Sequence, residues 1–308
     1  MTTETQGQTV GAARRRSSTA GTLKALLVSL RPQQWTKNLI LFAAVIFSGD
    51  LDHGMRLVDV AVAFVLFCVL SGCGYLINDA RDLERDRLHE RKRSRPMAAG
   101  ELSPQLAATI AAVGVAAALA GSFVLDPGFA AVAAGYLALQ LLYSFWLKEM
   151  VILDAMAIAG GFVLRVTAGA VVIDVSLSPW IVLCTALLAL FLAFAKRRHE
   201  LLMVEGAVDH RPALEHYSES FLDTMIATVT AATIVFYSLY TFWAHEGHQR
   251  SYMMLSVPFV AYGLFRYLYL MHMKDLGGSP ETVLLTDAPL IVDIVLWVVT
   301  VVAVLYFT

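Results

Sequence analysis

Oxygen-bearing side chains recur at helical spacing around residue 80. Asn78 and Asp79 are adjacent, and Asp82 and Asp86 follow them. In a helix these four side chains fall within an arc of about 100°, on one face. Carboxylates this close repel one another unless a cation lies between them, and Mg²⁺ prefers such hard oxygen ligands and also bridges to substrate phosphates. The spacing predicts a Mg²⁺ site of all four residues, with the three aspartates catalytic; the alternative is a solvated helix end paired with neighbouring arginines.

Basic residues follow these acids closely along the chain. The run at 87–95 includes Lys92 and Arg95. Ammonium and guanidinium groups suit phosphate oxygens, so we expect these two residues to bind the phosphates of a metal–diphosphate complex. The other cations of the run need no catalytic role, because Lys and Arg gather on the side of a membrane from which loops are not translocated.

The composition indicates that the elements positioning these residues lie in a membrane. Of 308 residues, 58% are hydrophobic and 16% are charged. The mean hydropathy is +0.65. Soluble domains carry about 25% charged residues, so a soluble enzyme is excluded. The expected fold is an all-α bundle of transmembrane helices.

Nine segments meet or approach the length of about 20 apolar residues that a spanning helix needs. They are 30–48, 57–77, 104–125, 128–147, 151–173, 178–195, 221–244, 252–272 and 289–307. The first is the weakest, because polar residues crowd its start. If it is not a true span, the C-terminus changes sides.

The distribution of basic residues predicts the orientation. With the N-terminus in the cytoplasm, most of the 23 Lys and Arg residues fall on the cytoplasmic side, as the positive-inside rule requires. Two long polar loops, 78–103 and 196–220, lie on that side. We therefore expect a plasma-membrane protein with a cytoplasm-facing active-site cavity. Residues 1–22 are expected to form a disordered cytoplasmic tail, and 23–308 the catalytic domain.

The first polar loop resembles a known signature. The pattern Asn78-Asp79-x-x-Asp82-x-x-x-Asp86, followed by Lys92, Arg95-Pro96 and Gly100, resembles the first motif of the UbiA-type intramembrane prenyltransferase superfamily. The resemblance extends from about residue 30 to the end. It implies two Asp-rich cytoplasmic loops and Mg²⁺, which ionise an isoprenyl diphosphate for transfer to an aromatic acceptor.

The second polar loop departs from that pattern. Where the superfamily has further aspartates, this chain has Lys196, Arg197 and Arg198, followed by Glu200. A dense cationic cluster suits phosphates better than a shared metal, so we expect these residues to bind substrate, with Glu200 orienting Lys196 or reaching the metal. A positive-inside anchor is the alternative.

This departure and the opening run Arg31-Pro32-Gln33-Gln34-Trp35-Thr36-Lys37-Asn38 resemble the decaprenyl-phosphate phosphoribosyltransferase branch of the superfamily. That resemblance implies Mg²⁺-dependent transfer of 5-phosphoribose from soluble phosphoribosyl diphosphate to a polyprenyl monophosphate, for cell-wall arabinan. The expected partners are these two substrates and the bilayer, with no nucleic acid and with homo-oligomerisation left open. One alternative is prenyl transfer to an aromatic acceptor. A transporter is disfavoured, because its charges should lie near the membrane midplane.

Polar residues within or beside other spans complete the expected substrate site. They are Lys37, Tyr143, Lys148, Asp154 and Arg165. A charge inside a spanning helix costs at least about 2.5–3.5 kcal/mol, so it usually faces the bundle interior or a watery cavity. Asp154 and Arg165 would lie about 16 Å apart in a helix and cannot pair. Lys148 could instead snorkel to the interface, and Lys37 could serve as an interfacial anchor.

Overall fold

The computed structural model describes residues 19–48, 54–88, 90, 92–203, 212–243, 252–274, 276, 278 and 280–307. These residues form helices and turns but no strand. In chain order the helices are α1 (Thr19–Ser29), η1 (Pro32–Phe42), α2 (Ala43–Phe47), α3 (Gly54–Arg81), α4 (Leu83–Leu88), η2 (Lys92–Ser94), α5 (Pro104–Leu125), α6 (Pro127–Phe145), η3 (Leu147–Glu149), α7 (Leu153–Val172), α8 (Pro179–Met203), η4 (Pro212–His216), α10 (Glu219–Trp243), η5 (Met254–Ser256), α12 (Val257–Met273), α13 (Pro280–Thr286) and α14 (Ala288–Phe307).

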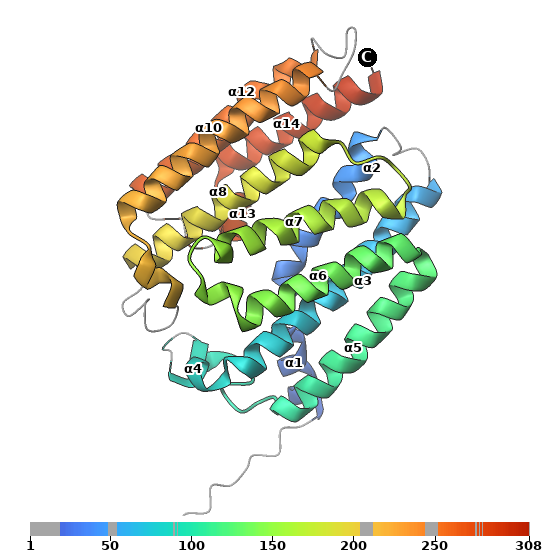
Figure 1. Ribbon diagram of the computed structural model, residues 1–308, viewed down its shortest axis with the longest axis vertical. Coiled ribbons are helices and arrows are strands. Elements are labelled where there is room, and N and C mark those ends of the chain that lie inside the picture. The colour runs from blue at the N-terminus through green and yellow to red at the C-terminus, as the bar shows by residue number, and fades with distance from the viewer. Residues whose placement is uncertain are drawn as a thin grey trace, which may run out of the picture.

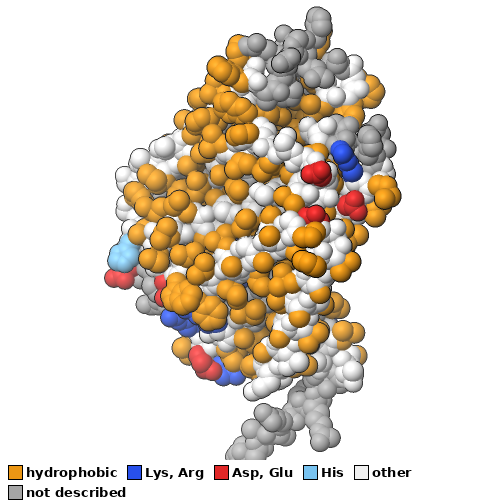
Figure 2. All heavy atoms as spheres, turned by 45° about the vertical axis from the view of Figure 1, so that its right-hand side comes forward, with side chains coloured by type: hydrophobic (Ala, Val, Ile, Leu, Met, Phe, Trp, Pro, Cys, Tyr) orange, Lys and Arg blue, Asp and Glu red, His pale blue; other side chains and the backbone are white. Residues whose placement is uncertain are grey.

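The expected all-α membrane fold is confirmed. Among the described residues, eight helices are long and apolar enough to cross a membrane: α3, α5, α6, α7, α8, α10, α12 with the preceding η5, and α14. Helices adjacent in the chain pack side by side from α5 through α10, and α3 packs against α5 (Figure 1). Hydrophobic side chains cover most of the face shown in Figure 2, as a surface in contact with lipid requires.

The expected count of nine helical spans is not confirmed, because residues 30–48 do not form one long α-helix. This segment is a long 3-10 helix, η1, followed by the short α2. Because a 3-10 helix rises about 2.0 Å per residue, the two elements together extend about 30 Å, which is the thickness of the hydrocarbon core. A long but stretched segment therefore takes the place of the expected first α-helix.

Contacts with α3 and α7 explain why η1 is held in this form. The buried Asn38 donates to Ser71 Oγ on α3 at 3.3 Å, and its carbonyl accepts from Arg165 Nε on α7 at 2.7 Å. The η1 backbone also touches α7 directly. A Cβ at Gly169 would lie 2.1 Å from the Leu41 carbonyl oxygen, so only glycine allows this approach.

Among the helices that begin at proline, α5 and α6 have a side-chain cap. Ser103 accepts from Leu106 N–H at 3.2 Å ahead of α5, and Asp126 accepts from Phe129 N–H at 2.6 Å ahead of α6. Such N-caps satisfy backbone donors that a helix start leaves open, and the proline that follows each cap lacks a donor there. The link between α5 and α6 is consequently very short.

Helix α1 was not expected from the sequence. It packs beside α3, with Ala25 buried. Its first residues, 19–22, belong to the segment expected as a tail, whereas 1–18 lie outside the described residues.

The buried apolar residues form two large clusters. One joins η1, α2, α3, α5, α6 and α7, around Phe67 and Phe129. The other cluster joins the first turn of α7, at Ala155, to α8, α10, α12 and α14, around Phe191 and Tyr267. Helix α7 contributes to both clusters and so connects two halves of the bundle.

Candidate active site

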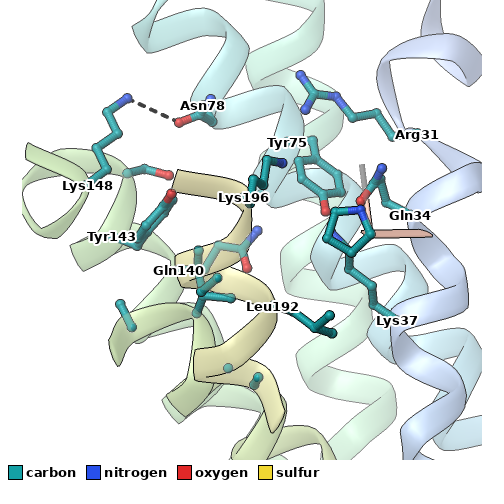
Figure 3. A pocket seen from close by; sticks show the side chains of 18 of the residues that line it. Arg31, Gln34, Lys37, Tyr75, Asn78, Gln140, Tyr143, Lys148, Leu192 and Lys196 are labelled. Carbon is teal, nitrogen blue, oxygen red and sulfur yellow. Dashed lines mark hydrogen bonds between the residues drawn. The ribbon is translucent and has the colours of Figure 1, made fainter. Parts of the chain in front are cut away.

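A cavity of about 830 Å³ is lined by residues of both halves. Its walls come from η1, α3, α6, η3, α7, α8 and α13. Its lining includes charged residues such as Asp82 and Lys196 and apolar residues such as Ile40, Leu139 and Leu192. Figure 3 shows Arg31, Gln34 and Lys37 on one side and Tyr143 and Lys148 on the other. One cavity thus offers both a polar and an apolar environment.

Most of the residues expected to form a site line this cavity. They are Lys37, Asn78, Asp82, Asp86, Lys92, Arg95, Tyr143, Lys148, Arg165, Lys196, Arg197 and Glu200. Asp79, Asp154 and Arg198 are not among the lining residues. The structure therefore brings together groups spread over more than half of the chain.

The four residues of the expected Mg²⁺ site form an acid stripe: Asn78, Asp79, Asp82 and Asp86. The stripe lies where α3 ends and α4 begins. The helical hydrogen bonds from Asp82 N–H to Asn78 and from Asp86 N–H to Asp82 continue across the junction. Asp79 and Asp86 are buried, and Asp82 is half-buried. The chain therefore keeps the four side chains at helical spacing.

Each aspartate of the stripe is bound to a basic side chain. Asp79 accepts from Arg31 at 2.5 Å and from Arg95 at 3.1 Å, and Arg95 also reaches Asp86 at 2.5 Å. Lys148 Nζ lies 2.7 Å from both carboxylate oxygens of Asp82. Buried carboxylates require such partners, because desolvation penalises an unpaired charge.

The donor set suits a divalent cation, although its oxygens are directed at basic groups. Three carboxylates and the Asn78 amide supply hard oxygen ligands of the kind Mg²⁺ prefers. Lys148 also donates to Asn78 Oδ1 at 3.3 Å, as Figure 3 shows. In the described part of the chain, no three His, Cys, Asp or Glu side chains converge on a metal position. A metal ion at the stripe would therefore compete with Arg95 and Lys148.

Lys92 also lines the cavity, and it follows the acid stripe closely in the chain. Burial, together with the nearby Arg95 charge, lowers the pKa of Lys92, and the neighbouring Asp86 and Glu200 partly offset this. Lys92 and Glu200 come from the two polar loops, so these loops meet at the cavity.

The cationic cluster of α8 divides into residues with different environments. Lys196 lines the cavity on the wall that α8 provides (Figure 3). Arg197 is 1% exposed; it donates to Asp154 at 2.6 Å and also pairs with Glu200. Arg198 instead pairs with Glu219 and Asp223 on α10, each at 2.6 Å. The structure does not bring Arg198 to the cavity.

Arg165 is buried among residues of several elements. It donates to Asn38 at 2.7 Å, to Tyr136 at 2.8 Å and to the Gly161 carbonyl at 2.9 Å. Its guanidinium also lies over the Tyr136 ring, 4.6 Å from the centroid. These contacts join η1, α6 and α7 at one wall of the cavity.

The sequence predicts no role for two residues that the structure places beside the acid stripe or behind the cavity wall. Arg31, directly before Pro32, belongs only to the opening run at 31–38. It has φ 53° and lies 4.7 Å from the Tyr75 ring centroid, besides contacting Asp79. The other residue is Tyr217, whose hydroxyl donates to Asp154 at 2.7 Å. Burial and this carboxylate raise the pKa of Tyr217, so its hydroxyl stays protonated.

A membrane bundle with acidic and basic groups gathered at an internal cavity can bind charged substrates within the membrane, as an intramembrane transferase must. The model of the UbiA prenyltransferase family matches residues 39–286, and the chain belongs to this family. The expected superfamily is thereby confirmed.

Curated relatives match nearly the whole chain. Decaprenyl-phosphate phosphoribosyltransferase of Mycolicibacterium smegmatis is 35% identical over 300 residues, covering 93% of this chain and 94% of the relative. The protein of the same name from Corynebacterium glutamicum is 37% identical, covering 91% and 86%. These matches support the branch that the sequence resembles.

Solved structures share the architecture. A UbiA homologue from Archaeoglobus fulgidus bound to GPP and Mg²⁺ superposes with a TM-score of 0.69 at 19% identity, covering 91% of this chain and 99% of that one. The same homologue bound to Cd²⁺ gives a TM-score of 0.66, with the same identity and coverage. At this identity the likeness shows the fold alone.

Proposed function

We propose that this protein transfers 5-phosphoribose from phosphoribosyl diphosphate to a polyprenyl monophosphate such as decaprenyl phosphate, with release of diphosphate. The product is a lipid-linked pentose phosphate for cell-wall arabinan. The observation that carries the proposal is the composition of the cavity, where Lys196 occupies the second polar segment in place of a second acid cluster. The names of the curated relatives support the same reaction.

The charges of the cavity match two phosphate-bearing substrates. Basic groups approach from different elements: Lys37 from η1, Lys92 and Arg95 after α4, Lys148 from η3 and Lys196 from α8. The donor carries a diphosphate and a 5-phosphate, and the acceptor carries another phosphate. Cations on several sides of one cavity can hold all three groups, whereas an isoprenyl diphosphate with a neutral aromatic acceptor needs fewer.

The acid stripe is assigned to the leaving-group side of the donor. Asn78, Asp79, Asp82 and Asp86 would hold Mg²⁺, as the metal-bound structures of UbiA homologues support. When bound, Mg²⁺ stabilises the negative charge that develops on the departing diphosphate. Lys92 and Arg95 stabilise the same charge from the protein side.

The acceptor needs little activation by the protein. A phosphate monoester is ionised at neutral pH, so its oxygen attacks the ribose C1 without a general base. The apolar lining residues, among them Ile40 and Leu192, offer hydrophobic contacts to the first lipid units. The remaining tail lies in the bilayer, while the phosphate end faces the cytoplasm, where the soluble donor enters.

The test compares the two reactions open to this family. Purified protein in detergent is given Mg²⁺ with either phosphoribosyl diphosphate and polyprenyl phosphate, or an isoprenyl diphosphate and an aromatic acceptor. We expect mass spectrometry of the organic phase to find a polyprenyl-phosphate-linked 5-phosphoribose in the first mixture. Prenylation of the aromatic acceptor, without product in the first mixture, would overturn the proposal.

A further inference from the structure

The chain reverses sharply between η3 and α7. Leu153 N–H donates to the Val151 carbonyl at 2.8 Å, which closes a three-residue turn centred on Ile152. Ile152 has φ 68° and ψ −48°. A γ-turn with a positive central φ is rare and strained, and a β-branched residue is particularly unfavourable there. Strain of this kind persists only where the surroundings enforce it.

The Tyr217 hydroxyl spans this turn. It accepts from Ile152 N–H at 2.7 Å and donates to Asp154 Oδ1 at 2.7 Å. Tyr217 is 5% exposed and Asp154 is fully buried. The other Asp154 oxygen is held by Arg197. A single hydroxyl from the second half of the chain therefore fixes both sides of the turn.

The turn follows directly on η3, which carries Lys148 to the acid stripe. Lys148 contacts both carboxylate oxygens of Asp82 and the Asn78 amide oxygen. Its neighbour Glu149 pairs with Arg85 at 3.1 Å. Lys148 and Ile152 are four residues apart, so both belong to the one short connection between α6 and α7.

We propose that Tyr217 is a positioning residue for the transfer reaction: its hydroxyl holds the γ-turn at Ile152 and thereby sets Lys148 beside Asp82. Tyr217 is not among the residues lining the cavity, so it acts through Lys148 and not on a substrate. The inference rests on the proposed function for its kinetic consequence. The geometry of the turn can be tested without that function.

The first experiment measures Lys148 in the absence of substrates. Tyr217→Phe keeps the ring, which stacks on Phe221, and removes only the hydroxyl. Mass spectrometry should show faster reductive methylation of Lys148 in this variant than in the wild-type protein. Tyr237→Phe is the matched control, because its buried hydroxyl contacts Ser256 and Trp297, away from the turn. It should leave the Lys148 methylation rate unchanged.

The second experiment measures transfer. Tyr217→Phe should lower kcat/KM by about tenfold, the effect of losing a hydrogen bond to a charged group. Lys148→Met should lower it further, and the double variant should be no worse than Lys148→Met alone, because both changes disturb one interaction. Tyr237→Phe should stay close to wild type.

The outcomes separate the two proposals. Unchanged Lys148 methylation in Tyr217→Phe, or additive losses in the double variant, would overturn the positioning role. If the wild-type protein makes no lipid-linked phosphoribose, the proposed function fails, and the methylation rates still decide whether Tyr217 positions Lys148.

Discussion

Arg197 and Asp154 form a buried ion pair, with 2.6 Å between Nε and Oδ2 and almost no exposure of either side chain. The pair joins α8 to the start of α7. Arg197 was expected to bind substrate phosphate. Its engagement by Asp154 and Glu200 instead favours a role in holding the site together.

Breaking this pair should destabilise the protein. Asp154→Ala leaves the buried Arg197 without one of its carboxylates, which should cost about 3–5 kcal/mol in the free energy of unfolding. Glu219→Ala, which removes an exposed partner of Arg198, should cost less than about 1 kcal/mol. Thermal unfolding in detergent compares the two variants. Equal, small effects would contradict a structural role for the buried pair.

Lys196 should behave differently from its neighbour Arg197. Because it lines the cavity, Lys196→Gln should raise the KM for phosphoribosyl diphosphate by about tenfold through loss of a charge-assisted contact. The unfolding temperature should not change. Lys274→Gln, an exposed cation at the end of α12, is the control for topology. If both variants keep the wild-type KM, Lys196 is an anchor only.

Arg95 should have opposite effects on metal binding and on turnover. It occupies two carboxylates of the stripe, so Arg95→Gln removes a competitor for a divalent cation. We expect tighter Mn²⁺ binding in the absence of donor, measured by electron paramagnetic resonance, together with a lower kcat. Asp82→Asn should weaken Mn²⁺ binding. Weaker binding in Arg95→Gln as well would show that Arg95 supports the metal site.

The pH dependence of the transfer reaction should reveal the titration of Lys92. Because burial and Arg95 lower its pKa, Lys92 loses its proton at a lower pH than an ordinary lysine. The pH dependence of kcat/KM for phosphoribosyl diphosphate reports the pKa values of groups in the free enzyme. This kcat/KM should therefore fall on the alkaline side as Lys92 becomes neutral. Lys92→Arg keeps the charge and should move that fall to higher pH. An unchanged alkaline limb would exclude Lys92 as the titrating group.

The sequence predicted the helical class from hydrophobic periodicity, and most of the cavity from polar residue types beside the spans and from the family resemblance. Apolar runs located the eight long helices, and helical spacing placed Asn78, Asp82 and Asp86 together. The expected span 178–195 ended too early, since α8 continues to Met203. Successive residues of a helix differ by about 100° in direction, which is why Arg197 and Arg198 have separate environments.

The remaining features depend on tertiary contacts that spacing does not reveal. The 3-10 form of η1 depends on the contact of Asn38 with Arg165 and on the approach of Leu41 to Gly169, between elements far apart in the chain. The positive φ values of Arg31 and Ile152 carry no sequence signal, since neither is glycine. The roles of Arg31 and Tyr217 follow from these conformations and needed the structure.

The partition of two labels from one donor tests the central claim most directly. Phosphoribosyl diphosphate labelled with ¹⁴C in the ribose and with ³²P in the terminal phosphate of its diphosphate is incubated with the protein, Mg²⁺ and polyprenyl phosphate. We predict that ¹⁴C enters the organic phase while ³²P stays in water as diphosphate, and that Asp82→Asn abolishes the separation. If both labels stay in water with the wild-type protein, or move together into the lipid, the protein is not a phosphoribosyltransferase of this kind.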